Sequence, residues 1–86
     1  MGVKTLFIVD DNRHICKIIA CQFRGDFNCK FFDNQAEALA AVNAGITPDV
    51  IVSDAQMDAP ESIPVIVYSK PFDPEDIVFE VNGKVK

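Results

Sequence analysis

The sequence has no tryptophan, one histidine and three cysteines, and these scarcities narrow the chemistry open to it. An odd number of cysteines without CxxC spacing, with His14 as the single histidine, argues against a zinc site. Cys16, Cys21 and Cys29 are instead typical of small apolar packing residues in a reducing compartment. A secretory pattern is also missing, since the apolar residues 6–9 are followed directly by two aspartates. We therefore expect a cytoplasmic protein.

Basic charge and long apolar runs are scarce as well. The formal net charge of −5 provides no electrostatic footprint for nucleic acid or for an anionic membrane. No apolar run approaches the roughly 20 residues that a membrane-spanning helix needs. The composition is nevertheless globular, with 49% hydrophobic and 24% charged residues. Its 86 positions are enough for one small domain, residues 1–86.

Apolar segments of two different periods alternate along the chain. Short apolar runs with β-branched members predict strands at residues 3–9, 27–32, 48–54 and 63–69. Helix formers and apolar residues at helical spacing predict helices over about 12–24, 35–45 and 73–81. This alternation predicts an α/β fold built from βαβ units around a mainly parallel sheet.

Individual residues predict where the helices begin, end and face. Gly25 and Asp26 would end the first helix, and Gly45 the second. Asp73 would cap the last helix, with Pro74 as its first residue. The predicted apolar faces are Ile15, Ile18, Ile19 and Phe23 for the first helix, and Ala36, Leu39 and Ala40 for the second.

Polar side chains gather at the carboxyl ends of the predicted strands, where open parallel sheets hold their functional groups. Asp10 and Asp11 follow the first strand, Asp54 ends the third, and Ser69 and Lys70 close the fourth. Carboxylates packed together repel each other, so at least one takes up a proton unless a cation neutralises them. Mg²⁺ is the usual intracellular choice for oxygen ligands, and an ammonium group binds phosphate oxygens. A carboxylate nucleophile, Mg²⁺ and a lysine are together the parts for phosphoryl transfer onto an aspartate.

Each of these residues, taken alone, also has a purely structural interpretation. Asp10 and Asp11 are good caps for the first helix, and Asp54 could be a turn residue at a strand end. Lys70 could be a solvated surface lysine. Their joint placement at one edge of the sheet favours a functional site.

Three segments, "LFIVDDN", "PDVIVSDAQM" and "SKPFDPEDI", together resemble the receiver domain of two-component response regulators. The resemblance covers residues 4–57 in register, and then the last strand and helix. It implies a flavodoxin-like three-layer α/β/α fold, shortened here to about four strands in the order 2-1-3-4. It also implies a phosphoacceptor and not an enzyme, with at most Mg²⁺-dependent self-phosphorylation and dephosphorylation.

Carried over by position, the resemblance implies a role for each site residue. Asp54 would be the phosphoacceptor and a Mg²⁺ ligand, and Lys70 would pair with the phosphoryl group. Asp11 would bind Mg²⁺ directly and Asp10 through water, while the backbone carbonyl of Gln56 would complete the protein ligands. The implied partner is a sensor histidine kinase or a phosphotransfer protein, with no nucleic acid and no membrane.

The chain is shorter than a receiver, which has five strands and five helices. Only nine residues, 55–63, separate Asp54 from Pro64, which is too few for a packed helical crossover between parallel strands. We therefore expect an extended connection. With that helix missing, apolar residues of the third and fourth strands are expected to be uncovered, and the exposed sheet edge to support a homodimer.

The junction of Ser69 and Lys70 allows two alignments with a receiver. As strand four, residues 63–69 would make Ser69 the switch hydroxyl; as strand five, they would put Lys70 and a cis Pro71 where the family has them. Successive side chains of a strand point to opposite faces, so one regular strand cannot aim both Ser69 and Lys70 at one phosphoryl group. The longer match, "KPFDPE", favours the second alignment. The alternative function is a receiver-derived interaction module, or a truncated receiver, that keeps the acid pocket but signals poorly.

Overall fold

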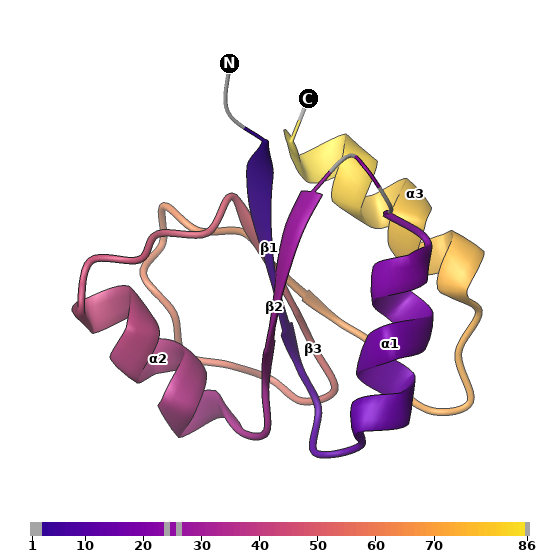
Figure 1. Ribbon diagram of the computed structural model, residues 1–86, viewed down its shortest axis with the longest axis horizontal. Helices are drawn as coiled ribbons and strands as arrows, with labels where there is room; N and C mark the ends of the chain where they lie inside the picture. Colours follow the sequence, from indigo (N-terminus) through magenta and orange to yellow (C-terminus); the bar gives the residue numbers. More distant parts are fainter. Residues whose placement is uncertain (1–2, 24, 26, 86) are drawn as a thin grey trace.

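The computed structural model describes residues 3–23, 25 and 27–85. Over these residues the chain forms four strands, β1 (Lys4–Val9), β2 (Phe27–Phe32), β3 (Val50–Ser53) and β4 (Val65–Val67). It also forms three helices, α1 (Arg13–Cys21), α2 (Gln35–Asn43) and α3 (Pro74–Val85), as Figure 1 shows. The expected helix end at position 24 and the stop at Asp26 lie outside the described residues.

The described strands form one parallel sheet in the order β2-β1-β3-β4, which confirms the predicted order. Helices α1 and α3 cover one face of this sheet, and α2 covers the other (Figure 1). The fold is therefore a flavodoxin-like α/β/α arrangement reduced to four strands among the described residues. Parallel pairing places the carboxyl ends of β1 and β3 side by side, with Val9 opposite Ser53.

The core consists of two hydrophobic clusters, one on each face of the sheet. On the α1 and α3 face, alternate residues of β1 and β3 pack with the buried sides of both helices; this cluster includes Leu6, Ile8, Val50, Val52, Ile19 and Ile77. On the α2 face the intervening strand residues do the same; this cluster includes Phe7, Val9, Ile51 and Ala38. Burial of β1 and β3 from both faces explains why these strands read as continuous apolar runs.

Helix termini follow the capping signals of the sequence. The Asn12 side chain accepts hydrogen bonds from the backbone N–H groups of His14 and Ile15, which makes Asn12 the N-cap of α1. Asn34 caps α2 in the same way through the N–H of Glu37. After α2, Gly45 adopts φ 101°, and this left-handed conformation, which glycine tolerates best, ends the helix as expected.

The predicted apolar faces of the helices are correct only in part. In α1, Ile19 is buried but Ile18 is 38% exposed, and Cys16 is buried in its place. In α2, Ala36 and Ala40 are exposed. The face that packs on the sheet is made by Ala38, Leu39, Ala41 and Val42. Helix α2 carries apolar residues around much of its circumference, so spacing alone does not determine its buried side.

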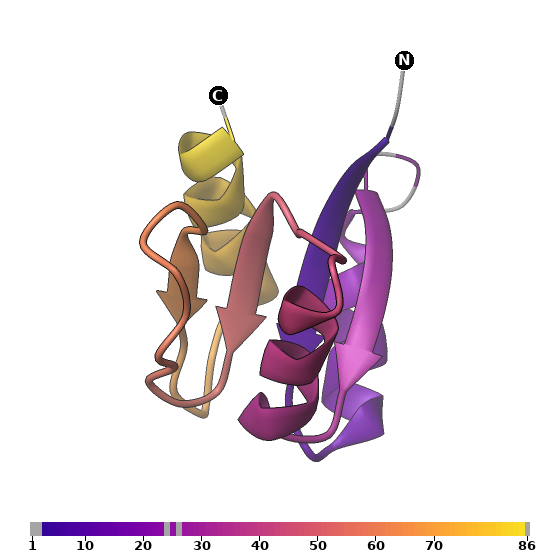
Figure 2. The same cartoon turned by 90° about the vertical axis from the view of Figure 1, so that its left-hand side faces the viewer.

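The connection between β3 and β4 contains no helix over residues 54–64, all of which the structure describes. The expectation that β3 would be uncovered is wrong, because all four of its residues are buried. Met57 and Ile63, each 5% exposed, belong to the cluster on the α2 face and cover β3 from the connection itself. Figure 2 shows this connection on the same side of the sheet as α2. Met57 and Ile63 thus cover β3 on this face without a helix between β3 and β4.

Strand β4 forms one edge of the sheet and is less well covered than β3. Ile66 is buried, Val65 is partly buried, and Val67 is 43% exposed. The expected uncovered apolar surface is therefore confined, on these two strands, to β4. Among the described residues, no helix is both long and apolar enough to cross a membrane.

Candidate functional site

The turn after β3 places Asp54 beside the end of β1. The N–H of Asp54 donates a hydrogen bond to the carbonyl of Val9 at 3.2 Å, which extends the pairing of β1 and β3 by one residue. The buried Ser53 hydroxyl donates to the carbonyl of Ala55 at 2.8 Å and accepts from its N–H, closing a tight turn. The backbone therefore fixes where the Asp54 side chain starts.

Asp10, Asp11 and Asp54 form one acidic cluster, as the sequence predicted. Each offers one carboxylate oxygen, and these three atoms lie within 4.8 Å of one another. Asp10 is fully buried, Asp54 is partly buried and Asp11 is exposed. Because Asn12 is the N-cap of α1, helix capping does not account for the two aspartates before it.

Lys70 extends into this cluster from the segment after β4. Its ammonium nitrogen lies 3.2 Å from both carboxylate oxygens of Asp10 and 3.8 Å from Oδ2 of Asp54. The hydrogen bond to Asp10, together with the charges of both aspartates, raises the pKa of Lys70. The lysine is therefore a permanent cation at this site.

Asp10 remains charged although its side chain is fully buried. Burial raises the pKa of Asp10. Hydrogen bonds from the Tyr68 hydroxyl, the Asn12 N–H and Lys70 lower it, and together they outweigh burial, so the pKa of Asp10 lies below its ordinary value. Among the described residues, every buried side-chain nitrogen and oxygen has a hydrogen-bond partner. A buried carboxylate is tolerated here because its partners replace the water it has lost.

Asp54 is shifted in the opposite direction. Its partial burial and the negative charge of Asp10 raise the pKa of Asp54, and Lys70 offsets only part of this effect. The two carboxylates are therefore inequivalent. Asp10 is held by several hydrogen bonds and is ionised. Asp54 has fewer hydrogen-bond partners, and its carboxylate is repelled by the charge of Asp10, which favours reaction or cation binding at Asp54.

The structure combines features of the two alignments that the sequence left open. β4 pairs directly with β3, and the segment after it brings Lys70 to the carboxylates. Ser69 is exposed. Tyr68 and Lys70, which follow the end of β4, both reach Asp10, so Lys70 and not Ser69 is directed into the site. The Lys70–Pro71 peptide bond is cis, as expected.

Tyr68 is the site residue that sequence reasoning missed. It is 7% exposed and its hydroxyl donates a 2.5 Å hydrogen bond to Oδ2 of Asp10, 58 positions away in the chain. Its ring packs against Phe72 with the ring centroids 4.8 Å apart. One signal in the sequence could have identified it. Tyr68 is the only tyrosine of the chain and lies two residues before Lys70, and a buried tyrosine hydroxyl normally needs a polar partner.

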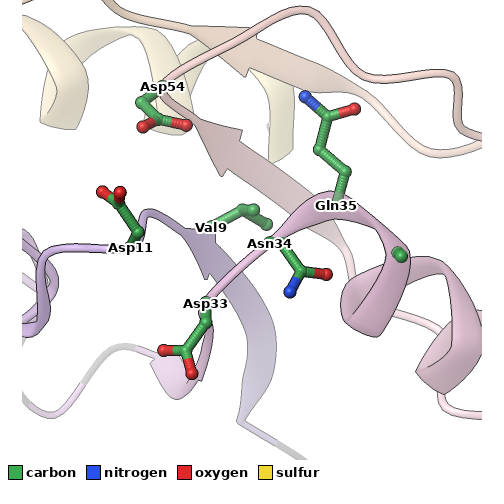
Figure 3. A pocket seen from close by; sticks show the side chains of 7 residues that line it. Val9, Asp11, Asp33, Asn34, Gln35 and Asp54 are labelled. Carbon is green, nitrogen blue, oxygen red and sulfur yellow. The ribbon is translucent and has the colours of Figure 1, made fainter.

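An open hollow of about 430 Å³ lies beside the cluster and is lined by Val9, Asp11, Asp33, Asn34, Gln35, Ala36 and Asp54. Figure 3 shows Asp11 and Asp54 with their carboxylates directed toward each other, whereas Asp33 points away. Asp33 instead accepts a hydrogen bond from Arg13 at 3.1 Å. Asp54 can therefore be reached from the α2 side of the sheet edge.

The cluster fits the requirements of Mg²⁺. Three carboxylates and one ammonium leave a formal local charge of about −2, which a divalent cation neutralises. Two oxygens bound to one Mg²⁺ at about 2.0–2.1 Å are at most about 4.2 Å apart, so oxygens within 4.8 Å of one another need only a small contraction. Gln56 is exposed two residues after Asp54, and the role of its backbone carbonyl stays a prediction.

Compared with the models of known protein families, with curated proteins and with solved structures, the chain matches none.

Proposed function

We propose that the protein is a phosphoacceptor of the receiver type, which takes a phosphoryl group on Asp54 from a histidine kinase or a phosphotransfer protein in the cytoplasm. The observation that carries this proposal is the position of Lys70 between Asp10 and Asp54, at 3.2 and 3.8 Å. A lysine held beside an accessible carboxylate, with two more carboxylates next to it, is a suitable arrangement for phosphoryl transfer. The receiver-like motifs in the sequence support the same reading.

The chemistry assigns a distinct task to each residue. A carboxylate oxygen of Asp54 attacks phosphorus, the new O–P bond forms as the P–N bond of the donor phosphohistidine breaks, and the imidazole nitrogen leaves with the electron pair. Lys70, whose Nζ lies 3.8 Å from Oδ2 of Asp54, would pair with the phosphoryl oxygens and offset their negative charge. Asp10 keeps Lys70 oriented toward Asp54.

A divalent cation fits the same site. Asp11 and Asp54 would hold Mg²⁺ directly, with Asp10 acting through water and the carbonyl of Gln56 completing the set. When bound, Mg²⁺ supplies a positive charge that stabilises the charge developing on the transferred phosphoryl group. The protein contributes fixed carboxylates at the ends of two neighbouring strands.

The test is phosphorylation by a small-molecule donor. The protein is incubated with acetyl phosphate and Mg²⁺, and its intact mass is measured with and without a chelator. We expect one added phosphoryl group that disappears in Asp54→Asn and with the chelator. Asp33→Asn is the matched control, because Asp33 lines the same hollow but points away from the cluster. An adduct that survives Asp54→Asn, or no adduct at all, contradicts the proposal.

The exposure of Ser69 favours a second candidate function. In a receiver, a hydroxyl at the end of strand four would report phosphorylation to the surface. Here Ser69, the serine after β4, is exposed, and residues 54–64 form no helix through which a signal could pass. The alternative is a receiver-derived interaction module that keeps the acid pocket and binds Mg²⁺ while its phosphorylation is weak or uncoupled. Mg²⁺ binding without an Asp54 adduct would favour this alternative.

A further inference from the structure

We infer that Tyr68 is a positioning residue of the acidic cluster, because its hydroxyl holds Asp10 in the orientation in which Asp10 faces Lys70 and the cation site. This inference rests on the proposed function, since it concerns the same site. Tyr68 lies on the buried side of the cluster, where protein groups and not solvent determine the orientation of the Asp10 carboxylate.

The hydrogen bond between Tyr68 and Asp10 is shielded from water. The Asp10 side chain is 0% exposed and Tyr68 is 7% exposed. The distance of 2.5 Å lies in the range of hydrogen bonds from a hydroxyl to an ionised carboxylate, which are among the stronger ones in proteins. Water cannot readily replace a partner at this depth, so loss of the hydroxyl leaves Oδ2 without its closest donor.

Both oxygens of Asp10 are held, and from two different elements. Oδ1 accepts a hydrogen bond from the N–H of Asn12 at 2.9 Å, in the turn before α1, while Oδ2 accepts one from the hydroxyl of Tyr68, the residue that follows β4. A carboxylate fixed at both oxygens cannot rotate about its terminal bond. Lys70 lies 3.2 Å from both oxygens and therefore meets a carboxylate whose orientation is already set.

Tyr68 is the more rigid of the two side-chain donors to Asp10. The side chain of Lys70 is 42% exposed, whereas the ring of Tyr68 belongs to the hydrophobic cluster and packs against Phe72. The outer hydrogen-bond partners of metal ligands typically contribute about 10–100-fold to metal affinity. Asp10 acts on the cation through water and Tyr68 supports Asp10, so we expect removal of the Tyr68 hydroxyl to weaken cation binding by about tenfold, at the lower end of that range.

The test compares Tyr68→Phe with Phe72→Leu. The first keeps the ring and removes the hydroxyl; the second keeps the hydroxyl and disturbs the packing of the ring. Calorimetric titration with Mg²⁺ is expected to give a Kd about tenfold higher in Tyr68→Phe, and a clearly smaller increase in Phe72→Leu, which keeps the hydroxyl that holds Asp10. Equal Kd values for Tyr68→Phe and the unmodified protein, or an equal loss in both variants, would show a merely structural role.

A spectroscopic measurement on the unmodified protein needs no variant. The chain has one tyrosine and no tryptophan, so its tyrosine fluorescence reports on Tyr68 alone. A carboxylate acceptor quenches tyrosine emission, and we expect Mg²⁺ to change this emission along the same saturation curve as the calorimetric binding. Binding without any change in emission overturns the inference, even if Tyr68→Phe does not fold. If the unmodified protein binds no Mg²⁺, the cation requirement of the proposed function fails as well.

Discussion

Replacement of Ile63 by alanine is expected to destabilise the protein strongly, because Ile63 and Met57 cover β3 where no helix lies between β3 and β4 among the described residues. Ile63 is 5% exposed, so the change removes a buried side chain and leaves a cavity. Such substitutions typically cost about 2–5 kcal/mol. The connection can partly collapse into the gap, which places the expected loss at about 2–3 kcal/mol.

This loss is large relative to the stability of so small a domain, which is about 4–13 kcal/mol for a chain of this length. It corresponds to a decrease in Tm of about 10–20 °C, at roughly 4–8 °C per kcal/mol. Thermal unfolding followed by circular dichroism measures this shift. Ile46→Ala is the matched control, because Ile46 is 43% exposed and should change Tm little. Equal shifts in the two variants would show that the connection does not pack on β3 as described.

Three further changes test other parts of the structure. Asp54→Asn should raise the urea midpoint at neutral pH without divalent cations, since burial and the charge of Asp10 raise the pKa of Asp54 and make its ionised form costly in the folded state. An acid whose folded pKa is raised loses stability as the pH rises from its unfolded value through that folded pKa, so this decline should be present in the unmodified protein and absent in Asp54→Asn. Asp10 has a lowered pKa in the folded state, so it stabilises the fold at pH values above its unfolded-state pKa. This stabilisation is lost as the pH falls through its folded-state pKa, so the urea midpoint should drop at acidic pH in both proteins. Lys70→Met should slow acetyl phosphate transfer to Asp54 by about a hundredfold while Mg²⁺ binding persists, and an unchanged rate would remove Lys70 from the reaction. The homodimer expected through the sheet edge should appear in sedimentation as a concentration-dependent dimer that Val67→Lys abolishes, because Val67 is 43% exposed on edge strand β4; a clean monomer at high concentration would count against it.

Local signals in the sequence were sufficient to predict the framework of the fold. β2 was predicted with the bounds that the structure has, because "FNCKFF" lies between clear breaking residues. Asp73 accepts the N–H of Glu75 and α3 starts at Pro74, as the capping signals indicate. α3 was predicted to end at residue 81, whereas it extends to Val85, because the poor helix former Gly83 lies within it.

Long-range contacts account for most of what sequence reasoning missed. The acidic cluster could be predicted because parallel strands necessarily bring their carboxyl ends together. The hydrogen bond from Tyr68 to Asp10 joins residues 58 positions apart, and no local pattern encodes it. The cover of β3 by Met57 and Ile63 also depends on how a loop folds back, which neither spacing nor propensity determines.

Mapping of the modified residue is the most direct test of the proposal that Asp54 is a cation-dependent phosphoacceptor. After reaction with acetyl phosphate and Mg²⁺, borohydride reduces an aspartyl phosphate to homoserine, which peptide mass spectrometry locates in the chain. We expect homoserine at position 54, no homoserine there when a chelator replaces Mg²⁺, and no conversion at Asp33. Conversion at another aspartate, or equal conversion with the chelator, would contradict it.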